Sequence, residues 1–146
     1  MSTTSASVGT SVPADMPAVA GVRHRFVQAR GIRFHVAEAG DVDAPVVVLL
    51  HGWPSNWYCW REHFAPLAAA GLRPIAIDLR GFGWSETTPH GYRKASMARD
   101  VLAVLDALNV DRFRLAGHDW GGFVAFLLGL AHPERVERLV LLNTGH

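Results

Sequence analysis

Short apolar runs alternate with helical patterns along this chain from residue 45 onward. The first run, Pro45–Leu50, holds five consecutive aliphatic residues and is typical of a strand buried on both faces. Further strands are predicted at Pro74–Asp78 and Arg112–Ala116, and a fourth, also buried, at Val136–Leu142. Because helices are predicted between these strands, the alternation indicates right-handed βαβ units and a mostly parallel sheet.

Three helices are expected between the strands. Asn56–Ala70 carries large apolar residues at three- and four-residue spacing, and Gly71 is expected to close it. Ala95–Leu108 shows a second apolar stripe of the same period. Gly122–Ala131 is apolar nearly all round, which predicts a buried helix.

The residues before the first buried strand follow a different pattern. Val22–Ala37 alternates apolar and polar residues around a turn at Arg30-Gly31, which predicts an antiparallel hairpin. Residues 1–21 are rich in Ser, Thr, Ala, Val and Pro and are predicted to form a disordered tail. They lack the features of a secretory signal, and no run in the chain reaches the roughly 18 apolar residues of a membrane span. Residues 22–146 are expected to form a single domain.

Charge and cysteine content narrow the classes of function. The chain has 14 Lys and Arg residues against 13 Asp and Glu residues, a net charge of +1, and no basic cluster with interleaved aromatics. A nucleic-acid partner is therefore not expected. The single cysteine, Cys59, fits a reducing compartment and is expected to be buried as a small hydrophobe. These features predict a cytoplasmic protein with no membrane partner.

The hexapeptide Gly117-His118-Asp119-Trp120-Gly121-Gly122 lies between a predicted strand and a predicted buried helix. It has the layout of a nucleophile elbow, a strained turn that projects one reactive residue from the sheet between small neighbours. The start of the helix is expected to keep Asp119 ionised. A carboxylate at this place suits displacement at a saturated carbon, which yields an alkyl ester of the enzyme. The structural alternative is an ordinary helix-capping Asp.

A second motif, His51-Gly52-Trp53-Pro54, follows the first buried strand. A loop at this place supplies one backbone N–H of an oxyanion hole, here that of Trp53, and the residue after the nucleophile, Trp120, supplies the other. The two donors would hold the ester carbonyl of alkylated Asp119 while water attacks it. The alternative is a simple turn between a strand and a helix.

With these motifs in place, the chain resembles the N-terminal half of an α/β-hydrolase, and most of all an epoxide hydrolase. The resemblance covers about residues 22–146 and rests on residues 51–54, Trp57-Tyr58, Trp60-Arg61, residues 78–83 with Ser85, residues 117–122 and residues 133–136. It implies an α/β-hydrolase fold, an epoxide as the small-molecule substrate, and no cofactor or metal. It also implies packing roles for His51 and His118 and a cis peptide bond between Trp53 and Pro54.

The same resemblance implies a later acid, a later histidine, and a helical lid whose two tyrosines protonate the epoxide oxygen. No Asp follows Asp119, the later carboxylates are Glu134 and Glu137, and His146 is the last residue. The sequence therefore predicts a truncated α/β-hydrolase fold, without the lid, general base and acid of the C-terminal catalytic half, and incomplete for turnover. The sheet edge at Val136–Leu142 is expected to be unpaired, with self-association through it.

Two other functions stay open. A haloalkane or haloacid dehalogenase also uses an Asp nucleophile, and its leaving halide needs N–H donors such as Trp120 or the Trp53 indole. Haloalkane dehalogenases commonly carry a polar side chain at the Trp53 position, which disfavours that alternative. The third possibility is a non-catalytic truncated fragment. Asp78 and Asp100 are expected to be loop and helix-surface residues, and the tryptophans Trp57 and Trp60 are expected to pack in the interior.

Overall fold

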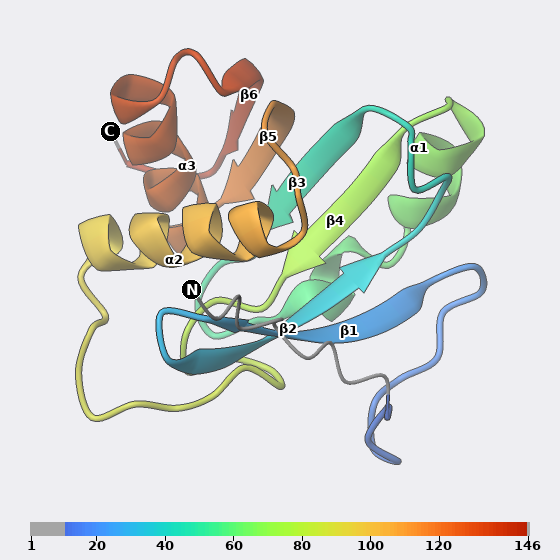
Figure 1. Cartoon of the computed structure of the whole chain (residues 1–146), viewed down its shortest axis with the longest axis horizontal. Helices are drawn as coiled ribbons and strands as arrows, with labels where there is room; N and C mark the ends of the chain where they lie inside the picture. Colours follow the sequence, from blue (N-terminus) through green and yellow to red (C-terminus); the bar gives the residue numbers. More distant parts are fainter. Residues whose placement is uncertain (1–10, 146) are drawn as a thin grey trace, which may run out of the picture.

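A computed structural model describes residues 11–145, which form a six-stranded sheet with helices on both faces (Figure 1). Along the sheet the strand order is β1-β2-β4-β3-β5-β6. The strands are β1 (Arg23–Ala29), β2 (Ile32–Glu38), β3 (Val46–Leu50), β4 (Arg73–Ile77), β5 (Phe113–His118) and β6 (Val136–Leu142). The four strands from β3 to β6 pair with one another in parallel. β1 and β2 form an antiparallel hairpin, and β2 pairs antiparallel with β4. This confirms the mostly parallel α/β sheet with an N-terminal antiparallel hairpin.

The helices divide the core into two apolar layers. The short 3₁₀ helix η1 (Trp57–Trp60) and α1 (Phe64–Ala69) lie on one face, and α2 (Lys94–Ala107) and α3 (Trp120–Ala131) lie on the other (Figure 1). Because side chains alternate along a strand, β3 supplies both layers. Val48 and Leu50 pack toward α2 and α3, and Val47 and Leu49 pack toward η1 and α1. The predicted burial of β3 on both faces is confirmed.

The single helix predicted across Asn56–Ala70 is wrong, because the structure breaks it into η1 and α1. The Asn56 side chain accepts the Tyr58 N–H at 2.9 Å and begins the tight turn of η1. In a continuous helix, Pro66 would remove a hydrogen bond in the interior, whereas in α1 it lies in the first turn, where that N–H has no partner to lose. Gly71 closes α1 with a φ of +76°, as predicted.

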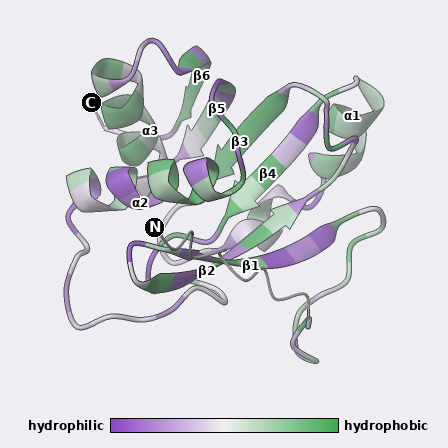
Figure 2. Ribbon diagram, viewed as in Figure 1, coloured by the Kyte–Doolittle hydropathy of each residue, from purple (hydrophilic) through white to green (hydrophobic). Residues whose placement is uncertain are grey.

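The predicted burial of β6 and of all sides of α3 is also wrong. Within the described residues β6 pairs only with β5 and lies at the edge of the sheet (Figure 1). Val140 of β6 is 52% exposed and Leu130 of α3 is 65% exposed. Val124 and Leu128 of α3 are buried, so the helix covers the sheet with one face only. Figure 2 colours most of α3 as hydrophobic and shows both hydrophobic and hydrophilic segments on β6.

The tail predicted for residues 1–21 is only partly described, since residues 1–10 lie outside the described residues. In the described part, Met16 is buried in the layer that contains η1 and α1. The Trp84 indole N–H donates to the carboxylate of Asp15 at 3.3 Å. The segment around residues 15–16 therefore packs on the domain, and the disorder predicted for it is wrong, because an apolar Met side chain is available to anchor it.

Two polar residues, Cys59 and Asp100, do not lie where the sequence predicted. Cys59 is exposed rather than buried, because η1 presents it on its outer side. Asp100 of α2 is buried rather than on the helix surface, and it accepts hydrogen bonds from Arg80 at 2.7 and 2.8 Å and from Arg30 at 2.5 Å. Asp78 lies in the loop after β4, as predicted, and is fully buried. A buried carboxylate needs such donors, which the helical pattern alone does not reveal.

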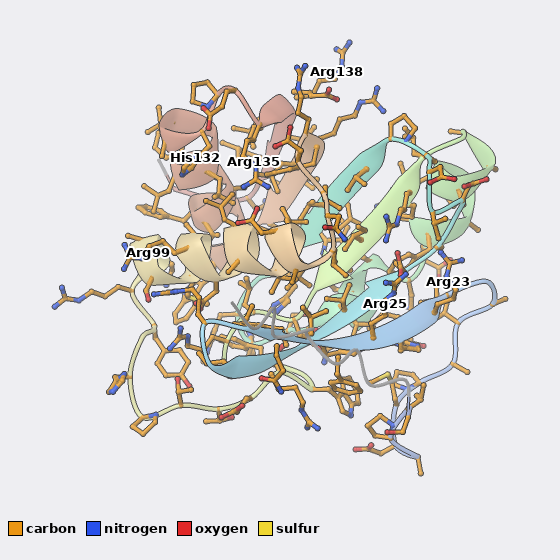
Figure 3. All side chains as sticks on the ribbon, in the orientation of Figure 1. Arg23, Arg25, Arg99, His132, Arg135 and Arg138 are labelled. Atoms are coloured by element: carbon orange, nitrogen blue, oxygen red, sulfur yellow. The ribbon has the colours of Figure 1, made fainter. Side chains whose placement is uncertain are left out.

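A buried ion cluster lies where the end of β2 meets the start of β4. Glu38 at the end of β2 is fully buried and receives Arg73 of β4 at 2.6 and 2.7 Å. Arg25 of β1 contacts the other carboxylate oxygen at 2.5 Å, and Arg23 lies 4.0 Å from Glu38. Figure 3 labels Arg23 and Arg25 on β1. The cluster joins the antiparallel hairpin to the parallel part of the sheet.

Candidate active site

Asp119 lies on the sharp turn between the end of β5 and the start of α3. Its φ of +53° and ψ of −117° are a strained combination for a residue with a side chain. The surrounding backbone holds it there. The Asp119 N–H donates to the Leu142 carbonyl at 3.1 Å, and its own carbonyl accepts the Phe123 N–H at 3.1 Å and the Thr144 hydroxyl at 2.7 Å. Contacts from both β6 and α3 therefore stabilise the turn.

Two backbone donors act on the Asp119 carboxylate. The Trp53 N–H donates to Oδ1 at 2.8 Å, and this contact is the main reason that the pKa of Asp119 lies below its usual range. Burial opposes the shift, whereas the Trp120 N–H and the nearby His118 and Lys94 side chains lower the pKa further. The two residues predicted as donors thus both favour the ionised carboxylate.

Small residues make room for the turn. A Cβ at Gly52 would lie 2.6 Å from the Asp119 Cβ and 2.9 Å from its Oδ1. A Cβ at Gly117 would clash with the carbonyl of Gly121, and one at Gly121 would clash with two carbonyl oxygens at the end of β3. A Cβ at Gly122 would lie 2.6 Å from the Cβ of Thr144, which follows β6. The glycines of both motifs therefore allow the loop after β3, the elbow and α3 to touch.

The two motif histidines differ in environment. His51 is buried, its Nδ1 donates to the Gly52 carbonyl at 2.9 Å, and its Nε2 accepts the Leu79 N–H at 3.0 Å. Burial lowers the pKa of His51, which favours the neutral imidazole. Both ring nitrogens of this neutral ring are already engaged in hydrogen bonds. His118 is exposed and lines a cavity of about 250 Å³ with Trp60. The peptide bond between Trp53 and Pro54 is cis.

Asp78, which the sequence analysis left as a loop residue, lies at the centre of a hydrogen-bond network beside the site. Its Oδ1 accepts the Trp57 N–H at 2.7 Å, and its Oδ2 accepts the Trp84 N–H at 3.0 Å and lies 2.8 Å from Nδ1 of His35. Trp57 begins η1, directly behind the loop that carries Trp53. Asp78 therefore fixes the start of η1, and with it the end of the loop that carries Trp53. The Asp-Leu-Arg-Gly-Phe-Gly motif at the end of β4 was the available signal.

Lys94 was also missed by sequence reasoning. Its Nζ lies 3.1 Å from the centroid of the Trp120 ring, and the Phe82 ring packs edge-on against the same indole at 5.7 Å between centroids. Burial lowers the pKa of Lys94, while the charge of Asp119 opposes this shift. No spacing in the sequence links residues 94 and 120, so only the fold reveals the contact.

The search for other site types covered residues 11–145 only. In that part of the chain, no three His, Cys, Asp or Glu side chains lie close enough together to hold a metal ion. No helix there has both the length and the apolar character that a membrane crossing needs.

Residues 45–146 match the family model described as the alpha/beta hydrolase fold. The chain belongs to this family. It is 41% identical over 129 residues to AB hydrolase superfamily protein YfhM of Bacillus subtilis, an alignment that covers 86% of this chain and 45% of the relative. It is 42% identical over 121 residues to Epoxide hydrolase B of Mycobacterium tuberculosis, covering 80% of this chain and 34% of the relative.

Solved structures agree with the sequence relatives. An epoxide hydrolase from Vigna radiata superposes with a TM-score of 0.82 at 38% identity and covers 86% of this chain and 41% of its own. This α/β-hydrolase is therefore epoxide hydrolase-like in both sequence and structure. The chain spans less than half of the length of the relatives that it matches.

Proposed function

We propose that Asp119 is the nucleophile of an epoxide hydrolase-like reaction that forms an alkyl-enzyme ester. The observation that carries the proposal is the Trp53 N–H, which donates to the Asp119 carboxylate at 2.8 Å across 66 positions of sequence. This contact holds the carboxylate ionised and in place on a strained turn, as a nucleophile requires. The similarity to epoxide hydrolases supports the substrate class.

In the proposed first step, a carboxylate oxygen of Asp119 forms a bond to a ring carbon of the epoxide. The bond from that carbon to the ring oxygen breaks, and the ring oxygen takes a proton from water to become a hydroxyl, which leaves a hydroxide ion. In the second step, water adds to the ester carbonyl, the bond between the carbonyl carbon and the alkoxy oxygen breaks, and the alkoxy oxygen takes a proton from the added water as the diol leaves. The hydroxide of the first step takes the proton of the resulting carboxylic acid, which restores the Asp119 carboxylate. The backbone N–H groups of Trp53 and Trp120 are proposed to stabilise the oxyanion of this second step.

We further propose that these 146 residues form the ester without hydrolysing it at a useful rate. Water attack on an ester needs a general base. Within the described residues, no His, Asp or Glu side chain hydrogen-bonds to Asp119, and His51 has both ring nitrogens engaged.

We also propose a reducing, cytoplasmic setting, because the single cysteine has no partner cysteine in this chain.

Mass spectrometry tests the nucleophile directly. The purified chain is incubated with styrene oxide, and we expect an adduct with the mass of the epoxide at Asp119, identified by peptide mapping. Asp119→Asn should abolish the adduct. The matched control is Asp111→Asn, which removes an exposed carboxylate of the same kind and should leave the adduct unchanged. Absence of an adduct at Asp119, or its persistence at the same peptide in Asp119→Asn, would overturn the assignment, whereas alkylation of the exposed Cys59 thiol would not.

Product analysis separates the remaining alternatives. Diol should not exceed one equivalent per chain, and many equivalents would show that the chain turns over by itself. Chloride release from 1-chlorobutane or chloroacetate, without reaction of the epoxide, would instead favour a dehalogenase. A folded chain that reacts with none of these compounds would favour the non-catalytic fragment.

A further inference from the structure

Lys94 is a cation placed at the elbow from outside both sequence motifs. It is the first residue of α2, and its Nζ lies 3.1 Å from the centroid of the Trp120 ring. Trp120 directly follows the proposed nucleophile and is the first residue of α3. The Phe82 ring packs edge-on against the same indole. The ammonium therefore rests on an aromatic platform next to Asp119.

The ammonium of Lys94 feels the charge of Asp119 but forms no close ion pair in the part of the chain that the structure describes. No carboxylate lies within 4.0 Å of it, and its three N–H donors make no hydrogen bond there. The arginines near buried carboxylates behave differently. Arg73 and Arg80 each form close ion pairs, with Glu38 and Asp100 respectively. Lys94 is thus a partly buried charge with unused donors beside the site.

We propose that Lys94 binds an anionic group of the substrate, so that the epoxides favoured by this site carry a carboxylate close to the ring. The inference rests on the proposed function of Asp119. An anionic substrate is repelled by the ionised nucleophile unless a cation lies nearby, because like charges at close range are unfavourable. Lys94 supplies that cation on the Trp120 side of the elbow, and its unused N–H donors suit a carboxylate oxygen.

A second role for Lys94 makes a different prediction. If Lys94 only assists ionisation of Asp119, its loss will slow the reaction of every epoxide by the same factor. If Lys94 binds the substrate, its loss will slow anionic epoxides more than neutral ones. The ratio of rates between two matched epoxides therefore distinguishes the two roles, whereas a single rate does not.

The test compares glycidate, glycidol and glycidyltrimethylammonium, which share one epoxide ring and carry a negative, no and a positive charge. The rate of adduct formation at Asp119 is measured by mass spectrometry, and each rate is divided by that of the same probe with acetate, to remove intrinsic reactivity. We expect glycidate to react about five- to tenfold faster than glycidol, a typical gain from a charge-assisted hydrogen bond, and the cationic probe to react most slowly.

Lys94→Met should bring the normalised ratio of glycidate to glycidol to about one or below, because it removes the charge and keeps the chain length. Lys94→Arg should retain part of the preference. The matched control is Arg99→Met, which removes an exposed cation from the same helix and should leave the ratio unchanged. Figure 3 labels Arg99 on α2. Far-ultraviolet circular dichroism checks that each variant folds.

Each outcome bears on a stated claim. An unchanged ratio in Lys94→Met, or equal slowing of both probes, overturns the binding role of Lys94. Reaction of glycidol at Asp119 with no preference for glycidate also overturns it while leaving the proposed function intact. No adduct at Asp119 with any probe contradicts the proposed function itself. If Lys94→Met does not fold, salt decides, because added salt should slow only the reaction of glycidate with the wild-type chain.

Discussion

Asp119 combines backbone strain and a stabilised charge in one residue. The strain is held by the Leu142 carbonyl and the Thr144 hydroxyl, and the charge is favoured mainly by the Trp53 N–H. Neither feature acts alone, because the strained turn places the carboxylate where the Trp53 N–H points. The reactivity proposed for Asp119 therefore depends on residues from three segments of the chain.

The pKa of Asp119 predicts how ester formation depends on pH. Because this pKa is lowered, the carboxylate stays ionised as the pH falls past its ordinary value of 3.8 and is protonated only at lower pH. The same shift contributes stability above the unfolded value that is lost as the pH falls through the folded value. We expect the rate of adduct formation to have its midpoint below pH 3.8, measured with circular dichroism as a check on folding. A midpoint above that value would contradict the prediction.

Gly52 is predicted to control the position of the nucleophile. A Cβ at this residue would lie 2.6 Å from the Asp119 Cβ, so Gly52→Ala must displace one of the two loops. We expect adduct formation to slow on the order of 100-fold, since displacements near 1 Å have effects of this size. Gly145→Ala is the matched control, because a Cβ at Gly145 meets nothing within 4 Å. Equal rates in both variants would show that the site tolerates the displacement.

At the scale of elements, one buried carboxylate of α2 links this helix to two other segments of the fold, in addition to the apolar side chains that pack it on the sheet. Asp100 binds Arg80, which follows β4, and Arg30, which lies in the turn between β1 and β2. This anchors the N-terminal half of α2, the helix that begins with Lys94. The position of Lys94 at the elbow thus depends on a contact that lies outside the site.

Removing this carboxylate is predicted to destabilise the protein strongly. Asp100→Ala leaves Arg80 buried without its partner, and we expect a loss of about 3–5 kcal/mol in the free energy of unfolding in urea. Asp106→Ala, on the same helix, removes an Asp that pairs with Arg135 and is 64% exposed, and should cost less than about 1 kcal/mol. Similar losses in the two variants would contradict the distinction between buried and exposed pairs.

Elements differ in how far local patterns determine them. The apolar stripe of Ala95–Leu108 and the alternation of Val22–Ala37 predicted α2 and the hairpin within a residue or two. The pattern over Asn56–Ala70 predicted one helix where two exist, because apolar spacing does not register the effect of Pro66 and the Asn56 cap. Helical periodicity therefore located the helical segment but not the break between η1 and α1.

At the scale of the whole molecule, β6 and α3 carry five of the nine exposed large apolar residues in the described structure. Leu139, Val140 and Leu142 of β6 are exposed, as are Phe123 and Leu130 of α3. β6 also presents unpaired backbone groups along its outer edge in the described structure. An exposed strand of this kind is a template for pairing with another chain. We therefore keep self-association through β6 as a prediction.

A charge on β6 tests this prediction. Val140→Lys should shift the chain toward the monomer in size-exclusion chromatography at several concentrations, because a charged side chain on an edge strand opposes pairing. Val42→Lys provides the matched control, since Val42 is 53% exposed and Val140 is 52% exposed, and Val42 lies in a loop far from β6 along the sheet. If the wild-type chain is monomeric at every concentration, the prediction is wrong.

The sequence by itself determined the α/β class, the place of Asp119 between a strand and a helix, and Trp53 and Trp120 as the neighbouring donors. These features follow from local periodicity and from two short motifs, each of which is a contiguous segment of the sequence. Only the tertiary structure decided the burial of Asp100, the anchoring role of Asp78, the exposure of β6 and the position of Lys94 over Trp120. Each of these depends on which distant segments come into contact, and periodicity along the chain carries no information about such contacts.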